Sequence, residues 1–129
     1  MRLSTVPAPI ARSTTEALGA AFSILHTLPK GVAPPAANLQ ALATCLNDAY
    51  VLLPKDTAPA AHDTLGATSA LAIAVGSTPH IHPETFNNLV QSMFASGAML
   101  IPAAGNNVSN IMHGAFDDAA TAQKYLAGA

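Results

Sequence analysis

Charged side chains are scarce in this chain of 129 residues. Lys, Arg, Asp and Glu together make up 9% of the sequence, whereas they make up about 25% of an ordinary soluble protein. From Thr64 to Phe116 the only formally charged side chain is Glu84. Soluble monomers normally keep exposed apolar patches small and place charges between them. The surface is therefore either a weakly charged one of Ala, Ser, Thr, Asn and Gly, or one that another protein chain covers.

Two further shortages argue against a nucleic-acid partner. The net charge is −2 and the five basic residues are widely separated, so the chain lacks the clustered positive charge that binds phosphate backbones. There is no Trp and there are only two Tyr, which leaves few rings on which unpaired bases would stack. We therefore expect no contact with nucleic acid.

Cysteines and long apolar runs are also nearly missing. The single Cys45 excludes an internal disulfide framework. The opening stretch MRLSTVPAPIARST has no apolar run long enough for the core of a signal peptide. No stretch approaches the 18 or more apolar residues of a membrane-spanning helix. We expect no signal peptide and no transmembrane span, and a chain that is cytoplasmic or associated with a virion.

Prolines mark the first boundary in the chain. Pro7 and Pro9 fix their own φ angles and favour extended backbone at the residues before them. Residues 1–12 are therefore predicted to form an extended arm, followed by a single helical domain over residues 13–129. Such an arm could lie across a neighbouring chain, which makes Pro7 and Pro9 candidates for an interface.

Four helices are predicted from capping residues, prolines and apolar spacing. Ser13 and Glu16 form a capping box at the start of the first helix. Thr57 suits the N-cap of the third helix, and Pro59 suits its first turn. The predicted spans are Ser13–Leu28, Pro35–Leu53, Thr57–Gly76 and Pro83–Ile101.

Apolar residues recur at helical spacing and define the expected core. They are Leu18, Phe22, Leu25 and Leu28 in the first helix, Leu39, Leu42, Leu46, Ala49 and Leu53 in the second, and Phe86, Leu89, Val90, Met93, Phe94, Leu100 and Ile101 in the fourth. The third helix is apolar nearly all round, which is typical of a central helix. Its stripe of Gly66, Ala70 and Ala74 favours close approach by another helix, within the chain or between chains.

Two shorter helices are predicted beyond these four. Val108 to Phe116 suggests a fifth helix, and Asp117 suits the N-cap of a sixth. No segment alternates with the period of a strand. The predicted fold class is all-α, a small bundle of five to six helices joined by short linkers, preceded by the N-terminal arm.

The stretch STPHIHPE carries the most chemical-looking residues in the chain. His80 and His82 are weak candidates for metal ligands, because the flanking Pro79 and Pro83 favour a polyproline geometry in which positions two apart diverge. A zinc site also needs three or four ligands, and no other residues stand in a ligand spacing. The alternative is a stiff connector in which Pro83 begins a helix and Glu84 favours its dipole.

Cofactor and catalytic motifs are absent from the sequence. There is no C-x-x-C-H attachment motif for haem. The one cofactor arrangement that we consider is a haem between facing helices, held by His26 or His113 together with a Met. No G-x-S-x-G, P-loop or H-E-x-x-H pattern occurs. Cys45 lies beside a predicted core seam, where free cysteines are mostly inert. We expect no cofactor, no bound metal and no enzymatic activity.

The leading functional hypothesis is a structural, self-associating subunit of a coat, shell, decoration or filament, with a virion as one setting. Its partners would be copies of itself or another structural protein. The predicted outer face of the fourth helix is polar but uncharged, and Asn87, Asn88, Gln91 and Ser92 are its interface candidates, with Ser96 on the same face. The alternatives are a helical module that binds a ligand or metal through histidines, and a small effector or inhibitor that binds another protein.

Overall fold

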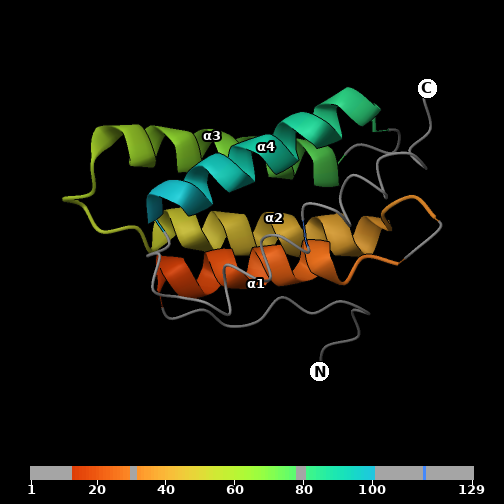
Figure 1. Cartoon of the computed structure of the whole chain (residues 1–129), viewed down its shortest axis with the longest axis horizontal. Helices are drawn as coiled ribbons and strands as arrows, with labels where there is room; N and C mark the ends of the chain where they lie inside the picture. The colour runs from red at the N-terminus through yellow and green to blue at the C-terminus, as the bar shows by residue number, and fades with distance from the viewer. Residues whose placement is uncertain (1–12, 30–31, 78–80, 101–114, 116–129) are drawn as a thin grey trace.

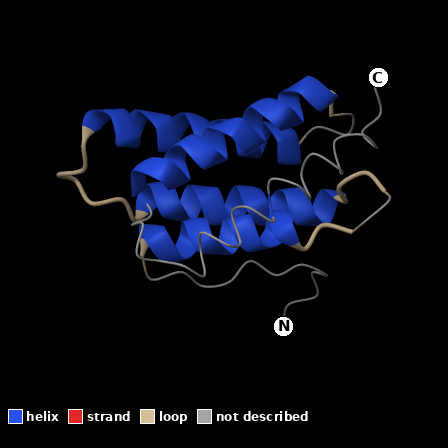
Figure 2. Ribbon diagram, in the orientation of Figure 1, coloured by secondary structure: helices blue, strands red, loops and turns tan. Residues whose placement is uncertain are grey.

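A computed structural model describes residues 13–29, 32–77, 81–100 and 115. In this part of the chain the fold is all-α, with four helices and no strand (Figure 2). The helices are α1 (Thr14–His26), α2 (Ala36–Val51), α3 (Pro59–Gly76) and α4 (Pro83–Leu100). Successive helices run in opposite directions, with α1 on α2, α2 on α3 and α3 on α4, and α4 also reaches α1 (Figure 1).

The helix boundaries follow the capping and proline signals closely. The Ser13 hydroxyl accepts a hydrogen bond from the Glu16 amide at 3.1 Å, as the capping box predicts. Pro83 is the first residue of α4, as predicted. The prediction for Thr57 was wrong, because Ala58 is the N-cap of α3. The Thr57 hydroxyl instead donates to the Pro54 carbonyl at 2.6 Å, within the turn that precedes the helix.

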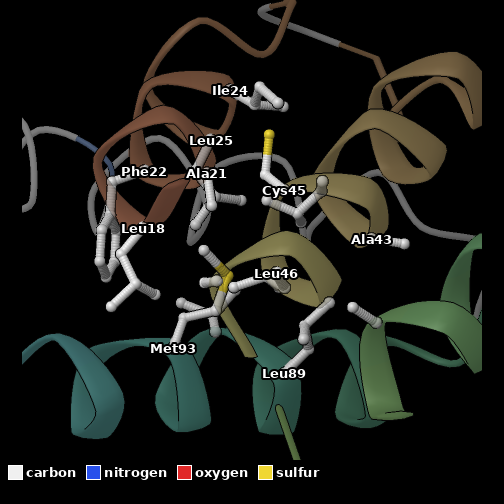
Figure 3. Close-up of a cluster of buried hydrophobic side chains, with 14 of the residues drawn as sticks. Leu18, Ala21, Phe22, Ile24, Leu25, Ala43, Cys45, Leu46, Leu89 and Met93 are labelled. Atoms are coloured by element: carbon white, nitrogen blue, oxygen red, sulfur yellow. The ribbon is translucent and has the colours of Figure 1, made fainter. Parts of the chain in front are cut away.

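The predicted apolar seams meet in one core. Every core residue predicted for the first two helices is buried, and so are Phe86, Leu89, Val90 and Met93 of α4. Of the rest of the predicted stripe, Phe94 and Leu100 are partly buried against the core, and Ile101 lies outside the described residues. Figure 3 shows Leu18 of α1, Leu46 of α2, and Leu89 and Met93 of α4 gathered in the same space. Such burial contributes about 1.5–3 kcal/mol for each large apolar side chain that leaves water.

Two contacts between α1 and its neighbours fix how this helix sits. The Thr14 hydroxyl, which is buried, donates to the Ala49 carbonyl of α2 at 2.9 Å. About two turns further along α1, the rings of Phe22 and Phe94 stack with centroids 5.2 Å apart. The first contact ties the start of α1 to the end of α2, and the second joins α1 to α4.

The contact between α3 and α4 contains a group of hydroxyls. Thr68 of α3 is fully buried, and its hydroxyl lies 2.5 Å from the Ser92 hydroxyl and 3.2 Å from the Ser96 hydroxyl of α4. The same Thr68 hydroxyl also donates to the Thr64 carbonyl at 2.7 Å. We call Thr68, Ser92 and Ser96 the hydroxyl cluster. Among the described residues no buried side-chain nitrogen or oxygen lacks a hydrogen-bond partner.

The third helix is less central than its composition predicts. It packs between α2 and α4, and Leu65 and Val75 are buried. However, Ala70 and Ala74 are exposed, and Ile73 is 48% exposed. The apolar residues of α3 therefore divide between the core and the outer surface, because a helix on the rim of a bundle has only part of its circumference against neighbours.

The arm over residues 1–12 and the predicted fifth and sixth helices lie outside the described residues, apart from one position. Ala115, within the predicted fifth helix, has helical backbone and is fully buried as part of the core cluster. The division into an arm and a single domain over 13–129 stays a prediction.

Candidate functional site

The outer face of α3 is built from small and apolar side chains. Its exposed positions in the middle and second half of the helix are Ala67, Ala70, Ile73 and Ala74. Of the predicted small-residue stripe, Ala70 and Ala74 lie on this face. Gly66 instead packs inside the chain, since a Cβ on it would lie 3.0 Å from the Tyr50 ring of α2. The stripe thus serves two surfaces, one internal and one external.

The outer face of α4 combines amides with small and apolar residues. Asn88 and Gln91 are exposed, as predicted, and Asn87 is half-buried. Ser92 is half-buried in the hydroxyl cluster and Ser96 is fully buried there, so neither lies on the open face that the sequence predicted for them. Their hydroxyls meet Thr68 because serine is small enough to fit a close contact between two helices.

Met99 belongs to the same face and sequence reasoning missed it. It is 45% exposed, beside the exposed Ala95 and Ala98. Ile73 of α3 is exposed as well, although the third helix was predicted to be central. The signal that was overlooked is position along the helix, because Ala95 and Met99 continue the line that runs through Asn88 and Gln91 at spacings of three and four.

We call the exposed residues of α3 from Ala67 onward and of α4 from Asn88 onward the neutral surface. They are Ala67, Ala70, Ile73 and Ala74 of α3 and Asn88, Gln91, Ala95, Ala98 and Met99 of α4. None of them is charged. The formal charges that border it are Asp63, exposed one turn before Ala67 on α3, and Glu84, at the first turn of α4. The surface thus has few charges that would repel an identical surface.

The exposed positions of α1 and α2 differ in character. They are mostly polar, namely Thr15, Glu16, His26, Gln40, Thr44 and Asn47, with Ala36 and Val51 as apolar exceptions. Hydroxyl, amide and imidazole groups keep this side well hydrated. The apolar part of the helical exterior therefore lies more on α3 and α4 than on α1 and α2.

The histidine candidates do not form a metal centre in the described part of the chain. His82 is exposed, and its Nδ1 accepts a hydrogen bond from the Glu84 amide at 3.2 Å. His80 lies outside the described residues. Nowhere in the described ranges do three or more His, Cys, Asp or Glu side chains gather as metal ligands would.

Cys45 lies in the core and points toward Ile24 of α1 (Figure 3). Burial, with a smaller contribution from the nearby Asp48 carboxylate, raises the pKa of the Cys45 thiol to about 11. A thiol with so high a pKa stays protonated at neutral pH and is a poor nucleophile. This position is thus a core position, as the seam of α2 predicts.

One further cluster joins α2 to the start of α3. The rings of Tyr50 and His62 are tilted with centroids 5.0 Å apart. The His62 Nδ1 lies 3.9 Å from the carboxylate of its exposed neighbour Asp63. An ion pair this exposed contributes little to stability. The cluster packs Tyr50 over Gly66, and among the described residues no third side chain of a metal-ligand type joins His62 and Asp63.

None of the four described helices combines the length and the hydropathy needed to cross a bilayer. No protein-family model, no curated protein and no solved structure matches this chain.

Proposed function

We propose that the chain is a structural, self-associating subunit without catalytic activity, and that its copies meet through the neutral surface of α3 and α4. The observation that carries this proposal is the pairing of exposed apolar residues with the absence of charge on that surface. Ile73 and Met99 remain 48% and 45% exposed on neighbouring helices. An apolar face of this kind on two adjoining helices is typical of a surface that another protein covers.

The amides of the surface suit contact with an identical copy. Asn88 and Gln91 each carry both donors and an acceptor, so an amide can pair with the same amide of a second chain. In a two-fold interface the same patch faces itself, which requires such self-complementary groups. The surrounding alanines lose almost no side-chain entropy when they are buried.

The size of the surface predicts a weak contact. Helices α3 and α4 have 18 residues each, which corresponds to about 27 Å of length. With neighbouring axes about 8–10 Å apart, the pair presents a face on the order of 500 Å². Two copies would bury on the order of 1,000 Å² in total, the lower limit for a specific interface. A subunit with such contacts gains stability when each copy makes several of them.

The geometry of association would decide the type of assembly. A two-fold contact gives a closed dimer, whereas a head-to-tail contact gives a ring, shell or filament. Coat, shell, decoration and filament roles, in a virion or elsewhere, all belong to the second kind or to combinations of both.

The test measures mass against concentration by sedimentation equilibrium of the full chain, from about 1 to 300 μM. The sharpest variant is Gln91→Glu, which keeps the shape of the side chain but removes its donors and adds like charge across the interface. Its matched control is Gln40→Glu, an exposed glutamine on α2. A second pair is Ala70→Glu on α3 and Thr44→Glu on α2, both exposed helix positions.

We expect the unmodified chain to associate, and Gln91→Glu and Ala70→Glu to weaken association at least tenfold. Gln40→Glu and Thr44→Glu should leave it unchanged. If the chain stays monomeric at 300 μM, self-association is wrong, and a protein that binds a different partner becomes the better hypothesis. If the α2 variants weaken association as much as the others, the neutral surface is not the contact.

A further inference from the structure

The first turn of α4 is capped by an imidazole. Pro83 is the first helical residue, so His82 stands at the N-cap. Its Nδ1 accepts from the Glu84 amide at 3.2 Å, and its carbonyl accepts from the Phe86 amide at 3.2 Å. The first bond satisfies one of the amides that a helix start leaves without an intrahelical partner, and the second is the first bond of the helix itself. Pro83 has no amide hydrogen, so it needs no partner.

The same position at α1 is occupied by a residue that does not titrate. Ser13 accepts from the Glu16 amide at 3.1 Å. Serine, threonine, asparagine and aspartate are the usual N-caps, and histidine is the side chain whose charge ordinarily changes between pH 5 and 8. Two helices of one bundle therefore begin with the same type of hydrogen bond, but only the cap of α4 can be removed by a proton.

We propose that His82 is a pH-sensitive cap that holds the first turn of α4 when it is neutral and releases it when it is protonated. The hydrogen bond requires a lone pair on Nδ1, so the proton of the neutral ring is on Nε2. Protonation turns Nδ1 into a donor, which cannot accept from the Glu84 amide. It also places a positive charge at the positive end of the helix dipole.

Among the described residues, the charged groups near the cap do not reverse this effect. Glu84 is the nearest, and its carboxylate would attract a protonated His82, but His82 and Glu84 are both exposed and such an attraction is weak in water. His26 ends α1 at the same end of the bundle (Figure 1). The start of α2 over 36–40 and the end of α3 over 73–77 bring no Lys, Arg, Asp or Glu.

The consequence for assembly rests on the proposed function, whereas the cap itself does not. The α4 part of the neutral surface begins at Asn88, directly after the first turns of the helix, so loss of the cap at low pH would loosen the support of that part and weaken association there. The cap is therefore tested first by unfolding in dilute solution, where association plays no part. Failure of that test leaves the neutral surface unaffected, and failure of self-association leaves the cap unaffected.

The experiment compares the full chain with His82→Asn, which keeps a capping acceptor that does not titrate. Urea unfolding at 2 μM gives the folding equilibrium constant of each protein between pH 7.5 and pH 5.0. The ratio of the two constants cancels the titration of every other histidine, because both proteins contain them. We expect this ratio to fall roughly fivefold on acidification, the factor that corresponds to a typical N-cap.

A Ser13→Asn variant provides the matched control, since its ratio to the unmodified chain should not change over the same pH range. The Glu84 amide proton, followed by NMR, should shift with the His82 ring, while the Glu16 amide proton should not. A ratio for His82→Asn that is flat with pH, or one that rises on acidification, would overturn the proposal.

Discussion

The two helix pairs of the bundle are held together by different groups. Between α1 and α2 the buried residues are mainly aliphatic, and one hydrogen bond, from Thr14 to the Ala49 carbonyl, crosses the contact among the described residues. Between α3 and α4 the contact includes the hydroxyl cluster of Thr68, Ser92 and Ser96. Their exteriors differ as well, with polar residues on the first pair and the neutral surface on the second.

This difference separates two sources of stability. Aliphatic contacts gain free energy in proportion to the area buried, and they tolerate other arrangements of similar volume. Hydroxyls contribute little net free energy when they are paired, but they destabilise the fold when a partner is missing. The first pair should therefore account for more of the stability, and the second should depend more on the alignment of its helices.

The largest expected effect is in the first pair. Leu46 is fully buried, so Leu46→Ala should lower the free energy of unfolding by about 2–5 kcal/mol through lost burial and a residual cavity. Val51 of the same helix is 70% exposed, and Val51→Ala should change the free energy of unfolding by less than about 0.5 kcal/mol. Urea unfolding measures both. A loss below 1 kcal/mol for Leu46→Ala would show that the core of this pair is loosely packed.

The next effect appears at high pH, at Cys45. Burial raises the pKa of the Cys45 thiol from its ordinary value of 9.0 to about 11, so the folded state resists ionisation of the thiol. The stabilisation is complete below pH 9 and is lost as pH rises toward 11, by about 1.4 kcal/mol at pH 10 and about 2 kcal/mol at pH 11. The unfolding free energy of Cys45→Ala should lack this part of the decline. Equal slopes for both proteins would contradict the burial of the thiol.

A smaller effect is expected in the second pair. Thr68→Val keeps the shape of the side chain but removes the hydroxyl that Ser92 and Ser96 contact. We expect a loss of about 1–2 kcal/mol, because the Ser96 hydroxyl is buried and would lose its Thr68 partner.

A double-mutant cycle with Ser96→Ala isolates that contact. Removing both hydroxyls should cost clearly less than the sum of the two single changes, with a coupling of at least about 0.5 kcal/mol. Additive losses would mean that the hydroxyl cluster does not act as a unit, and the contrast between the two pairs would then rest on their exteriors alone.

The sequence predicted the first pair better than the second. The spacing of Leu39, Leu42 and Leu46 identifies the buried side of α2, because large aliphatic residues have one favourable place to go. In α3 and α4, alanine and serine are compatible with a core, a close helix contact or an open surface. Spacing alone therefore misplaced Ser96 on the outside, and it did not identify the exposed side of α3 that carries Ile73.

The helix caps were predicted with uneven success, because some of them depend on more than the nearest residues. The Ser13 cap depends on residues within one turn, so the sequence sufficed. The cap at α3 was assigned to Thr57 although Ala58 occupies it, because the turn at Pro54 competes for the Thr57 hydroxyl. The capping role of His82 had no sequence signal, since histidine is not among the preferred N-caps.

The smallest expected changes in stability come from replacing one glycine in each helix pair by alanine. Gly19 lies within α1, and a Cβ there would meet nothing within 4 Å, so Gly19→Ala should stabilise the chain by about 0.5–1 kcal/mol through helix propensity. Gly66 lies within α3, where a Cβ would approach the Tyr50 ring at 3.0 Å. Gly66→Ala should therefore gain less than Gly19→Ala, or lose stability, when both are measured by thermal unfolding.

The Tyr50 ring is the reason for this difference, and it can be removed. In a Tyr50→Ala background, Gly66→Ala should recover the gain of about 0.5–1 kcal/mol that Gly19→Ala shows in the unmodified chain. Because Tyr50 also packs against His62, the ring has limited freedom to move away from a new methyl group. If Gly66→Ala stabilises the unmodified chain as much as Gly19→Ala does, the ring yields easily, and close approach of α2 and α3 is not what requires glycine there.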